Sequence, residues 1–142
     1  MDLDLPIKEA YAEITRETLP QVKDFIDFLD TIYPIPNFIY SIIGQLGWWL
    51  DPIPEKEFLE YLVAYSEASG FSFGQVYFLN YLYENLHHCT SVITKGADGT
   101  IAQGRSWDFP FSDYIEPMLL RAEYYRGGKL LYSSITIPGY AG

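Results

Sequence analysis

The spacing of apolar residues changes near residue 88 of the chain, from the period of helices to the alternation that is typical of strands. Before this point, apolar residues recur every three or four positions and predict five helices. These helices begin near Ile7, Val22, Asn37, Phe58 and Ser72. We expect Pro20 to separate the first two helices, and Pro34 and Gly70 to end the second and the fourth, because proline interrupts a helix and glycine favours the conformation that terminates one.

The fifth helix carries the clearest start signal. Ser72 and Gln75 match a capping box, in which each residue satisfies a free backbone N–H group of the other. Phe71 and Val76 occupy the two positions of a hydrophobic staple around the same helix start. The helix is therefore expected to begin at this motif and to deliver the chain to Cys89 at its carboxyl-terminal end.

Two β-hairpins are predicted after Cys89. Asp98-Gly99 and Gly127-Gly128 are turn sequences, and strand-like runs flank them at 90–95, 100–104, 118–126 and 129–137. The predicted fold class is therefore α+β, with a helical segment over residues 1–88 and the first antiparallel strands of a second part over residues 89–142.

The first hairpin predicts which side chains meet beside Cys89. If Asp98-Gly99 is a two-residue loop, Asp108 lies directly across from Cys89, and a thiol and a carboxylate share one site. Arg105 then points to the other face of the sheet, because successive side chains alternate between faces. Either a bulge, for which Gly104 is a natural position, or a loss of pairing is expected to re-aim it toward the thiol.

The charge of the chain narrows the classes of partner. Nineteen acidic and nine basic residues give a formal net charge of −10, which repels phosphate backbones, so nucleic-acid binding is not expected.

Residues 1–7 lack the basic flank and apolar run of a secretory signal peptide. The apolar stretch 35–50 is shorter than the roughly 20 residues that cross a bilayer.

Three short motifs after residue 88 resemble the start of the mature catalytic subunit in the family of acid ceramidases and N-acylethanolamine-hydrolysing acid amidases. These motifs are Cys89-Thr90-Ser91, Gly104-Arg105 and Asp108-Phe109. A cysteine followed at +16 by arginine and at +19 by aspartate also opens the wider choloylglycine-hydrolase-like group of N-terminal-nucleophile hydrolases. Three other segments resemble family motifs along nearly the whole chain, namely Leu3-Asp4-Leu5-Pro6, Phe78 to Leu86 and Gly139-Tyr140-Ala141-Gly142.

The resemblance concerns the amino-terminal portion of the family only. It implies that residues 1–88 form the helical α-subunit or pro-segment, and that residues 89–142 start the catalytic β-subunit, an αββα domain that this chain leaves incomplete. The family's later Glu, Asn and Arg are expected beyond Gly142. Because the Asn serves the oxyanion hole, this chain by itself is expected to be inactive.

The resemblance also implies a chemistry for the first motif. The precursor would cleave itself between His88 and Cys89, and the freed α-amine of Cys89 would act as the base for its own thiol. Arg105 would orient the substrate and the cysteine, and Asp108 would hold the new ammonium group by a charge-assisted hydrogen bond. No metal or cofactor is expected.

By this resemblance the protein is a hydrolase of lipid metabolism, an amidase for the linear amide of ceramide, a sphingolipid, or of a related N-acyl lipid such as an N-acylethanolamine. The choice between these two substrates stays open. A processed α/β heterodimer, peripheral membrane contact and a lysosomal or secretory compartment are also implied. The alternative is a truncated, inactive pseudoenzyme or a lipid-binding module that uses only its helices and aromatic surface.

Several residues have a second interpretation that the sequence leaves open. Taken without the resemblance, Cys89 is a buried small hydrophobe. His87 and His88 are either metal ligands or the exposed processing junction. Trp48 and Trp49 either meet a lipid surface or pack in the core. A run of four acidic residues either forms a paired-carboxylate site or interacts favourably with the dipole at a helix start. Its members are Asp51, Glu55, Glu57 and Glu60.

Overall fold

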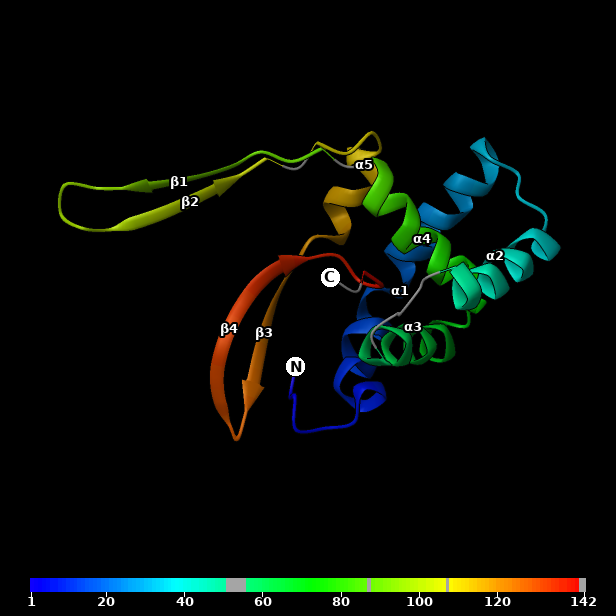
Figure 1. The fold of residues 1–142 in the computed structure, drawn as a ribbon, viewed down its shortest axis with the longest axis horizontal. Coiled ribbons are helices and arrows are strands. Elements are labelled where there is room, and N and C mark those ends of the chain that lie inside the picture. Colours follow the sequence, from blue (N-terminus) through cyan, green and yellow to red (C-terminus); the bar gives the residue numbers. More distant parts are fainter. Residues whose placement is uncertain (51–55, 87, 107, 141–142) are drawn as a thin grey trace.

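The computed structural model describes residues 1–50, 56–86, 88–106 and 108–140, with the side chains of residues 48–50 also left undescribed. The elements, in chain order, are α1 (Ile7–Ile32), α2 (Asn37–Leu50), α3 (Lys56–Ser69), α4 (Phe73–Leu86), β1 (Ser91–Lys95), β2 (Ile101–Arg105), α5 (Ser112–Ile115), the 3-10 helix η1 (Glu116–Met118), β3 (Leu120–Arg126) and β4 (Lys129–Thr136). Four long helices pack together, and two hairpins leave this helical body at different places (Figure 1). The predicted α+β class is confirmed.

Some of the open interpretations concern residues outside this description. Asp51, Glu55 and His87 are among them, as are the side chains of Trp48 and Trp49. Within the described ranges, no helix combines the length and the apolar character that crossing a membrane requires.

The prediction of two helices separated by Pro20 is wrong, because α1 runs unbroken from Ile7 to Ile32 with Pro20 inside it. Pro20 is exposed, and the buried side chains Thr15 and Val22 lie on either side of it in the sequence. A proline inside a helix costs about 3 kcal/mol. Burial of one continuous apolar face offsets this cost, and that face was not evident from local preference alone.

The predicted start of the last long helix is confirmed. The Ser72 side-chain oxygen accepts from the Gln75 N–H (3.3 Å), while the Gln75 side chain accepts from the Ser72 N–H (2.9 Å). Phe71 packs against the cluster that contains Val76, which is fully buried. Gly70 adopts a φ of 78° just after α3 and ends it as expected.

Close backbone approach fixes how α2 lies on α4. A Cβ atom added to Gly74 would lie 1.8 Å from the carbonyl oxygen of Tyr40, and one added to Gly44 would lie 3.3 Å from the backbone of Gly74. Only glycine allows two helices to meet this closely. The opposite side of α2 exposes Phe38, Ile42 and Leu46.

One hydrophobic core contains residues from both sides of position 88. Its buried members are Val22, Phe25, Ile26, Leu29, Tyr83, Phe109, Ile115, Met118 and Ile137. The helical segment and the segment after Cys89 therefore fold as one packed unit. A smaller cluster between α3 and α4 comprises Tyr61, Leu62, Tyr65 and Val76.

The two hairpins differ in their loops. In β1–β2, Lys95 pairs with Ile101, and the Gly96 N–H donates to the Thr100 carbonyl oxygen (2.7 Å). The loop therefore has three residues, 97–99, with Gly99 at a φ of 87°, and the predicted two-residue loop is wrong. Asp98 explains the difference, because its carboxylate accepts from both the N–H and the hydroxyl of Thr100 and favours the longer turn.

The second hairpin forms as predicted. Arg126 pairs with Lys129 across Gly127-Gly128, whose φ angles of 55° and 72° are both positive, as a tight type I′ turn requires. The first residues of the chain extend along this hairpin, where Asp2 forms a parallel bridge to Tyr125.

Candidate functional site

Cys89 and Arg105 lie side by side at the base of the β1–β2 hairpin. Cys89 is partly buried between α4 and β1. A guanidinium N–H of Arg105, from Nη2, donates to the Cys89 Sγ over 3.3 Å. The structure therefore brings together two of the three residues that the sequence predicts as catalytic.

The path by which Arg105 reaches the thiol differs from the prediction. Val92 pairs with Gly104 and Ser91 with Arg105 in an unbroken register, so Gly104 forms no bulge. With the three-residue loop, this register places Arg105 on the same face as Cys89 without any re-aiming. The predicted bulge is therefore wrong. The observed register differs from the predicted one by one residue, and this difference alone brings the guanidinium to the sulfur.

Asp108 pairs with His88 and not with Cys89. The His88 N–H donates to the Asp108 carbonyl oxygen (3.0 Å), and the Asp108 N–H donates to the His88 carbonyl oxygen (2.8 Å). The prediction that Asp108 lies directly across from Cys89 is therefore wrong by one position. This reciprocal pair holds the backbone next to the His88–Cys89 peptide bond.

The Asp108 carboxylate takes part in a small polar group beside that pair. It accepts from the Ser106 hydroxyl (3.2 Å), whose oxygen in turn accepts from the Thr90 N–H (3.1 Å). Because Asp108 and Cys89 are at alternate positions of the register, their side chains leave the backbone toward different faces. The role of the carboxylate in catalysis stays a prediction.

Three residues that sequence reasoning did not select pack together beside α4. Tyr83 on α4 is buried. Its ring lies 3.9 Å from that of Tyr140, centroid to centroid, and the Tyr140 hydroxyl donates to the Glu84 carboxylate (2.5 Å). All three lie in segments that carry the family resemblance, but only the folded structure shows that they meet.

The electrostatics of this group follow from burial and from the guanidinium. Burial raises the pKa of Tyr83, while the nearby positive charge of Arg105 opposes that rise. Burial also raises the pKa of Tyr140, and the hydrogen bond to Glu84 adds to the effect. The contact with Cys89 raises the pKa of Arg105. Both phenols are therefore neutral and Arg105 is charged at any physiological pH.

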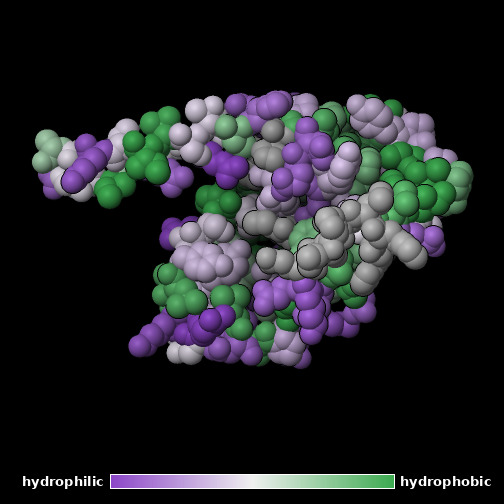
Figure 2. Space-filling model, viewed as in Figure 1, coloured by the Kyte–Doolittle hydropathy of each residue, from purple (hydrophilic) through white to green (hydrophobic). Residues whose placement is uncertain are grey.

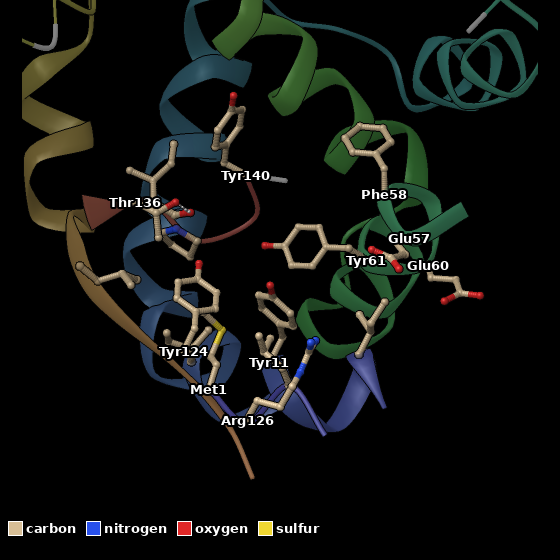
Figure 3. Close-up of a pocket in the computed structure, with 16 residues that line it drawn as sticks. Met1, Tyr11, Glu57, Phe58, Glu60, Tyr61, Tyr124, Arg126, Thr136 and Tyr140 are labelled. Carbon is tan, nitrogen blue, oxygen red and sulfur yellow. Dashed lines mark hydrogen bonds between the residues drawn. The ribbon is translucent and has the colours of Figure 1, made fainter. Parts of the chain in front are cut away.

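A separate cavity of about 460 Å³ lies between α1, α3 and the β3–β4 hairpin. The hydroxyl groups of Tyr11, Tyr61 and Tyr124 converge on it, with Arg126 at one side (Figure 3). Cys89 is not among its lining residues, whereas Tyr140 lines the cavity and also contacts Tyr83. Burial raises the pKa of Tyr11 to about 12, with smaller contributions from neighbouring tyrosines, so the cavity offers neutral hydroxyl groups.

Within the described residues, no group of three His, Cys, Asp or Glu side chains is placed to hold a metal ion. His88 instead has its backbone paired with Asp108.

Comparison with known proteins gives matches to two kinds of hydrolase, although no family model matches the chain. It is 21% identical to the acid ceramidase of Mus musculus over 159 aligned residues, which cover all of this chain and 40% of that protein. It is 22% identical to the N-acylethanolamine-hydrolyzing acid amidase of Caenorhabditis elegans, over all of this chain and 42% of that protein. The corresponding amidase of Cavia porcellus is 26% identical over 72% of this chain and 29% of its own length. The chain thus spans less than half the length of these curated relatives.

Proposed function

We propose that this chain belongs to the family of acid ceramidases and N-acylethanolamine-hydrolyzing acid amidases, to which it is similar along its whole length, and that it carries the nucleophile of an amidase that cleaves ceramide or a related N-acyl lipid. The observation that carries this proposal is the 3.3 Å contact between the Arg105 guanidinium and the Cys89 sulfur. A fixed positive charge beside a thiol stabilises the negative charge that the sulfur carries when it attacks a carbonyl. The likeness to two named amidases gives this pair its substrate class.

The proposed reaction has two steps. The Cys89 sulfur attacks the amide carbonyl carbon, the carbon–nitrogen bond breaks, and the amine leaves with a proton from the protonated base. Water then attacks the thioester carbonyl, the carbon–sulfur bond breaks, and the fatty acid is released as the thiol re-forms. Arg105 stays beside the sulfur in both steps and orients the cysteine.

We further propose that the base arises by cleavage of the His88–Cys89 bond. An α-amine has a pKa near 7.7 to 8, far closer to physiological pH than a lysine amine. The reciprocal backbone pair of His88 and Asp108 supports this proposal, since it fixes the chain next to the bond to be cut. Rotation of the Asp108 side chain toward the new ammonium group would then give the charge-assisted hydrogen bond that the proposal needs.

Residues 1–88 and 89–142 would remain associated after cleavage. The main hydrophobic core takes Val22, Phe25 and Tyr83 from the first segment and Phe109 and Met118 from the second. The chain contains one cysteine, so no disulfide within it can join the two fragments. The shared core is what would hold the processed α/β pair together.

Contact with a lipid surface would bring such an enzyme to its substrate. Phe38, Ile42 and Leu46 lie four residues apart on α2 and form an exposed apolar stripe. This stripe supports peripheral membrane contact, the alternative to a fully buried helix. A lysosomal or secretory compartment remains part of the proposal, and the word acid in the names of the relatives is its support.

The proposal is tested with the complete precursor at acidic pH. We expect a fragment whose first residue is Cys89, read by Edman sequencing, and hydrolysis of ceramide or an N-acylethanolamine, read by mass spectrometry. Cys89→Ala should abolish both, whereas Ser91→Ala, a change at an exposed position of β1, should abolish neither. A fully active precursor that remains uncut would refute the proposed base, and lipid binding without any turnover would favour the non-enzymatic alternative.

A further inference from the structure

The cavity between α1, α3 and the β3–β4 hairpin has the size and the lining of a ligand site. Its volume of about 460 Å³ lies within the range of small-molecule sites, about 300 to 1,000 Å³. Apolar side chains form much of its wall, namely Leu3, Ile7, Ile14, Phe58, Leu120 and Ile137. A few polar groups on such an apolar wall give a bound molecule its orientation.

Three tyrosine hydroxyl groups supply the polar part of this cavity. They belong to Tyr11, Tyr61 and Tyr124 and converge from α1, α3 and β3 (Figure 3). Ring contacts hold these side chains in place. The rings of Tyr11 and Tyr61 meet edge to face at 4.7 Å, and Tyr124 stacks on Tyr132 at 4.3 Å. Burial raises the pKa of both Tyr11 and Tyr61, so these groups stay neutral and can donate hydrogen bonds.

Arg126 adds a positive charge to the same part of the cavity. Its side chain extends from the end of β3 into the cavity on the side of Tyr11 (Figure 3). Within the described ranges, Arg126 takes part in no ion pair. A guanidinium group together with neutral hydroxyl donors is a suitable partner for a carboxylate, which carries a negative charge and only accepts hydrogen bonds.

Two carboxylates also line the cavity, but both lie away from the three hydroxyl groups. Glu60 pairs with Lys56 (3.4 Å) and points away from the centre of the cavity (Figure 3). Glu57 is exposed and lies at the backbone end of the Tyr61 side chain, away from its hydroxyl (Figure 3). Because water weakens the field of an exposed charge, Arg126 dominates at the hydroxyl groups.

We propose that this cavity binds an amphipathic carboxylate. The carboxylate group would accept hydrogen bonds from Arg126 and the tyrosine hydroxyls, and the apolar chain would lie along the wall formed by Ile7, Ile14 and Ile137. Fatty acids are the simplest molecules of this class. Cys89 does not line the cavity, so the site is separate from the proposed nucleophile and the inference does not rest on amidase activity.

The test compares three probes that share one alkyl chain and differ in the charge of the head group. Decanoate is negative, decanol neutral and decylamine positive at neutral pH. Isothermal titration calorimetry measures their binding to the full 142-residue chain, below the concentrations at which the probes form micelles. Decanoate should bind at least about tenfold more tightly than the other two, because hydrogen bonds to a charged group are the strong ones.

Substitutions in the cavity should change decanoate binding selectively. Arg126→Gln should weaken it about fivefold, the effect of one unit charge near 4 Å in water, and leave decanol binding unchanged. Tyr11→Phe keeps the ring and removes one donor, so decanoate binding should fall about tenfold. The matched controls are Arg121→Gln on the same strand and Tyr81→Phe on α4. Both change exposed residues that do not line the cavity and should leave decanoate binding unchanged.

Each outcome decides the inference. Equal affinity for the three probes would show that the cavity does not select a carboxylate, and tighter binding of decylamine would show that Glu57 and Glu60 dominate. Either result overturns the proposal, as does the absence of decanoate binding. Unchanged decanoate affinity in both Arg126→Gln and Tyr11→Phe would place the binding elsewhere, for example on the exposed stripe of α2. If one of these two variants fails to fold by circular dichroism, the other decides.

Cys89→Ala separates this inference from the proposed function. The variant chain should bind decanoate as tightly as the wild-type chain, although the complete protein with this change should hydrolyse no lipid. An active complete protein that does not bind decanoate at this cavity would refute the site alone. A complete protein that binds decanoate and never hydrolyses lipid would refute the proposed function alone.

Discussion

The β1–β2 and β3–β4 hairpins are made from similar parts but differ in their surroundings. Each has two antiparallel strands joined by a turn that contains glycine at positive φ. Every residue of β1 and β2 is exposed, and the hairpin extends away from the helices (Figures 1 and 2). In contrast, Ala122 of β3 is 2% exposed, and the first residues of the chain lie along this hairpin.

The difference shows that turn chemistry and docking have separate effects. Both hairpins form because their turn residues allow a reversal of the chain, and the turns also fix each register. A two-stranded hairpin without a covered face is only marginally stable in water. We therefore expect β3–β4 to share the stability of the body and β1–β2 to be held mainly at its base, where Arg105 contacts Cys89 and Asp108 pairs with His88.

The largest effect is expected from placing a charge on each hairpin in turn. Ala122→Glu should lower the free energy of unfolding by at least about 2 kcal/mol, because the carboxylate would be buried without a partner. Ala102→Glu, the same substitution at an exposed position of β2, should change it by less than about 0.5 kcal/mol. Urea unfolding followed by circular dichroism measures both, and equal losses would remove the distinction between the two hairpins.

A smaller effect is expected at alkaline pH, and it should concern the docked hairpin. Burial raises the pKa of Tyr11 from 10.0 to about 12, with Tyr124 and Tyr132 of the β3–β4 hairpin adding to the shift. Between these values the unfolded chain loses a proton that the folded chain keeps, so stability is complete below pH 10 and falls as the pH rises to 12. In Tyr11→Phe, this fall should be shallower by up to about 1.4 kcal/mol per pH unit.

Unfolding in urea at a series of pH values from 9 to 11.5 measures the alkaline effect. Tyr81→Phe is the control, since it removes an exposed phenol that lies away from both hairpins. Identical slopes in Tyr11→Phe and the wild-type chain would show that Tyr11 does not couple ionisation to the docking of β3–β4.

A third comparison removes one carboxylate from each turn region. The Asp4 side chain accepts a hydrogen bond from the Gly127 N–H and links the amino-terminal segment to the β3–β4 turn. Asp4→Ala should cost about 0.5 to 1.5 kcal/mol in unfolding free energy. Asp98→Ala should leave global unfolding unchanged and instead speed hydrogen exchange at the Thr100 amide, which the Asp98 carboxylate binds. Loss of global stability in Asp98→Ala would show that β1–β2 unfolds together with the body.

The smallest effect is expected at the outer part of the first hairpin. Ile93 is 70% exposed, so Ile93→Thr removes little buried surface and keeps a β-branched side chain. The free energy of unfolding should change by less than about 0.5 kcal/mol, measured as above. A loss of more than about 1 kcal/mol would mean that another part of the molecule covers this face.

Local sequence signals predicted much of this structure. The capping box at Ser72 and Gln75, the end of α3 at Gly70 and the Gly127-Gly128 turn are confirmed. Each is decided by residues within a few positions of one another. Where the prediction was wrong, as for Pro20, a distant part of the chain supplied the deciding energy.

The candidate site was predicted in composition but not in arrangement. The spacing of Cys89, Arg105 and Asp108 selected the residues. The loop between β1 and β2 is one residue longer than expected, so Asp108 pairs with His88 while Arg105 reaches the Cys89 thiol. Because successive side chains of a strand alternate between its two faces, one extra loop residue decides which face each side chain occupies.

The sequence by itself determined most helix and turn positions, the α+β class, and the presence of one thiol followed at +16 by an arginine and at +19 by an aspartate. Only the tertiary structure decided that α1 continues through Pro20, that one core spans both sides of position 88, and that Tyr83 and Tyr140 pack against each other. The physical reason is the range of the interactions. Caps and turns depend on neighbours along the chain, whereas burial and packing depend on residues that are distant in sequence and that only the folded chain brings together.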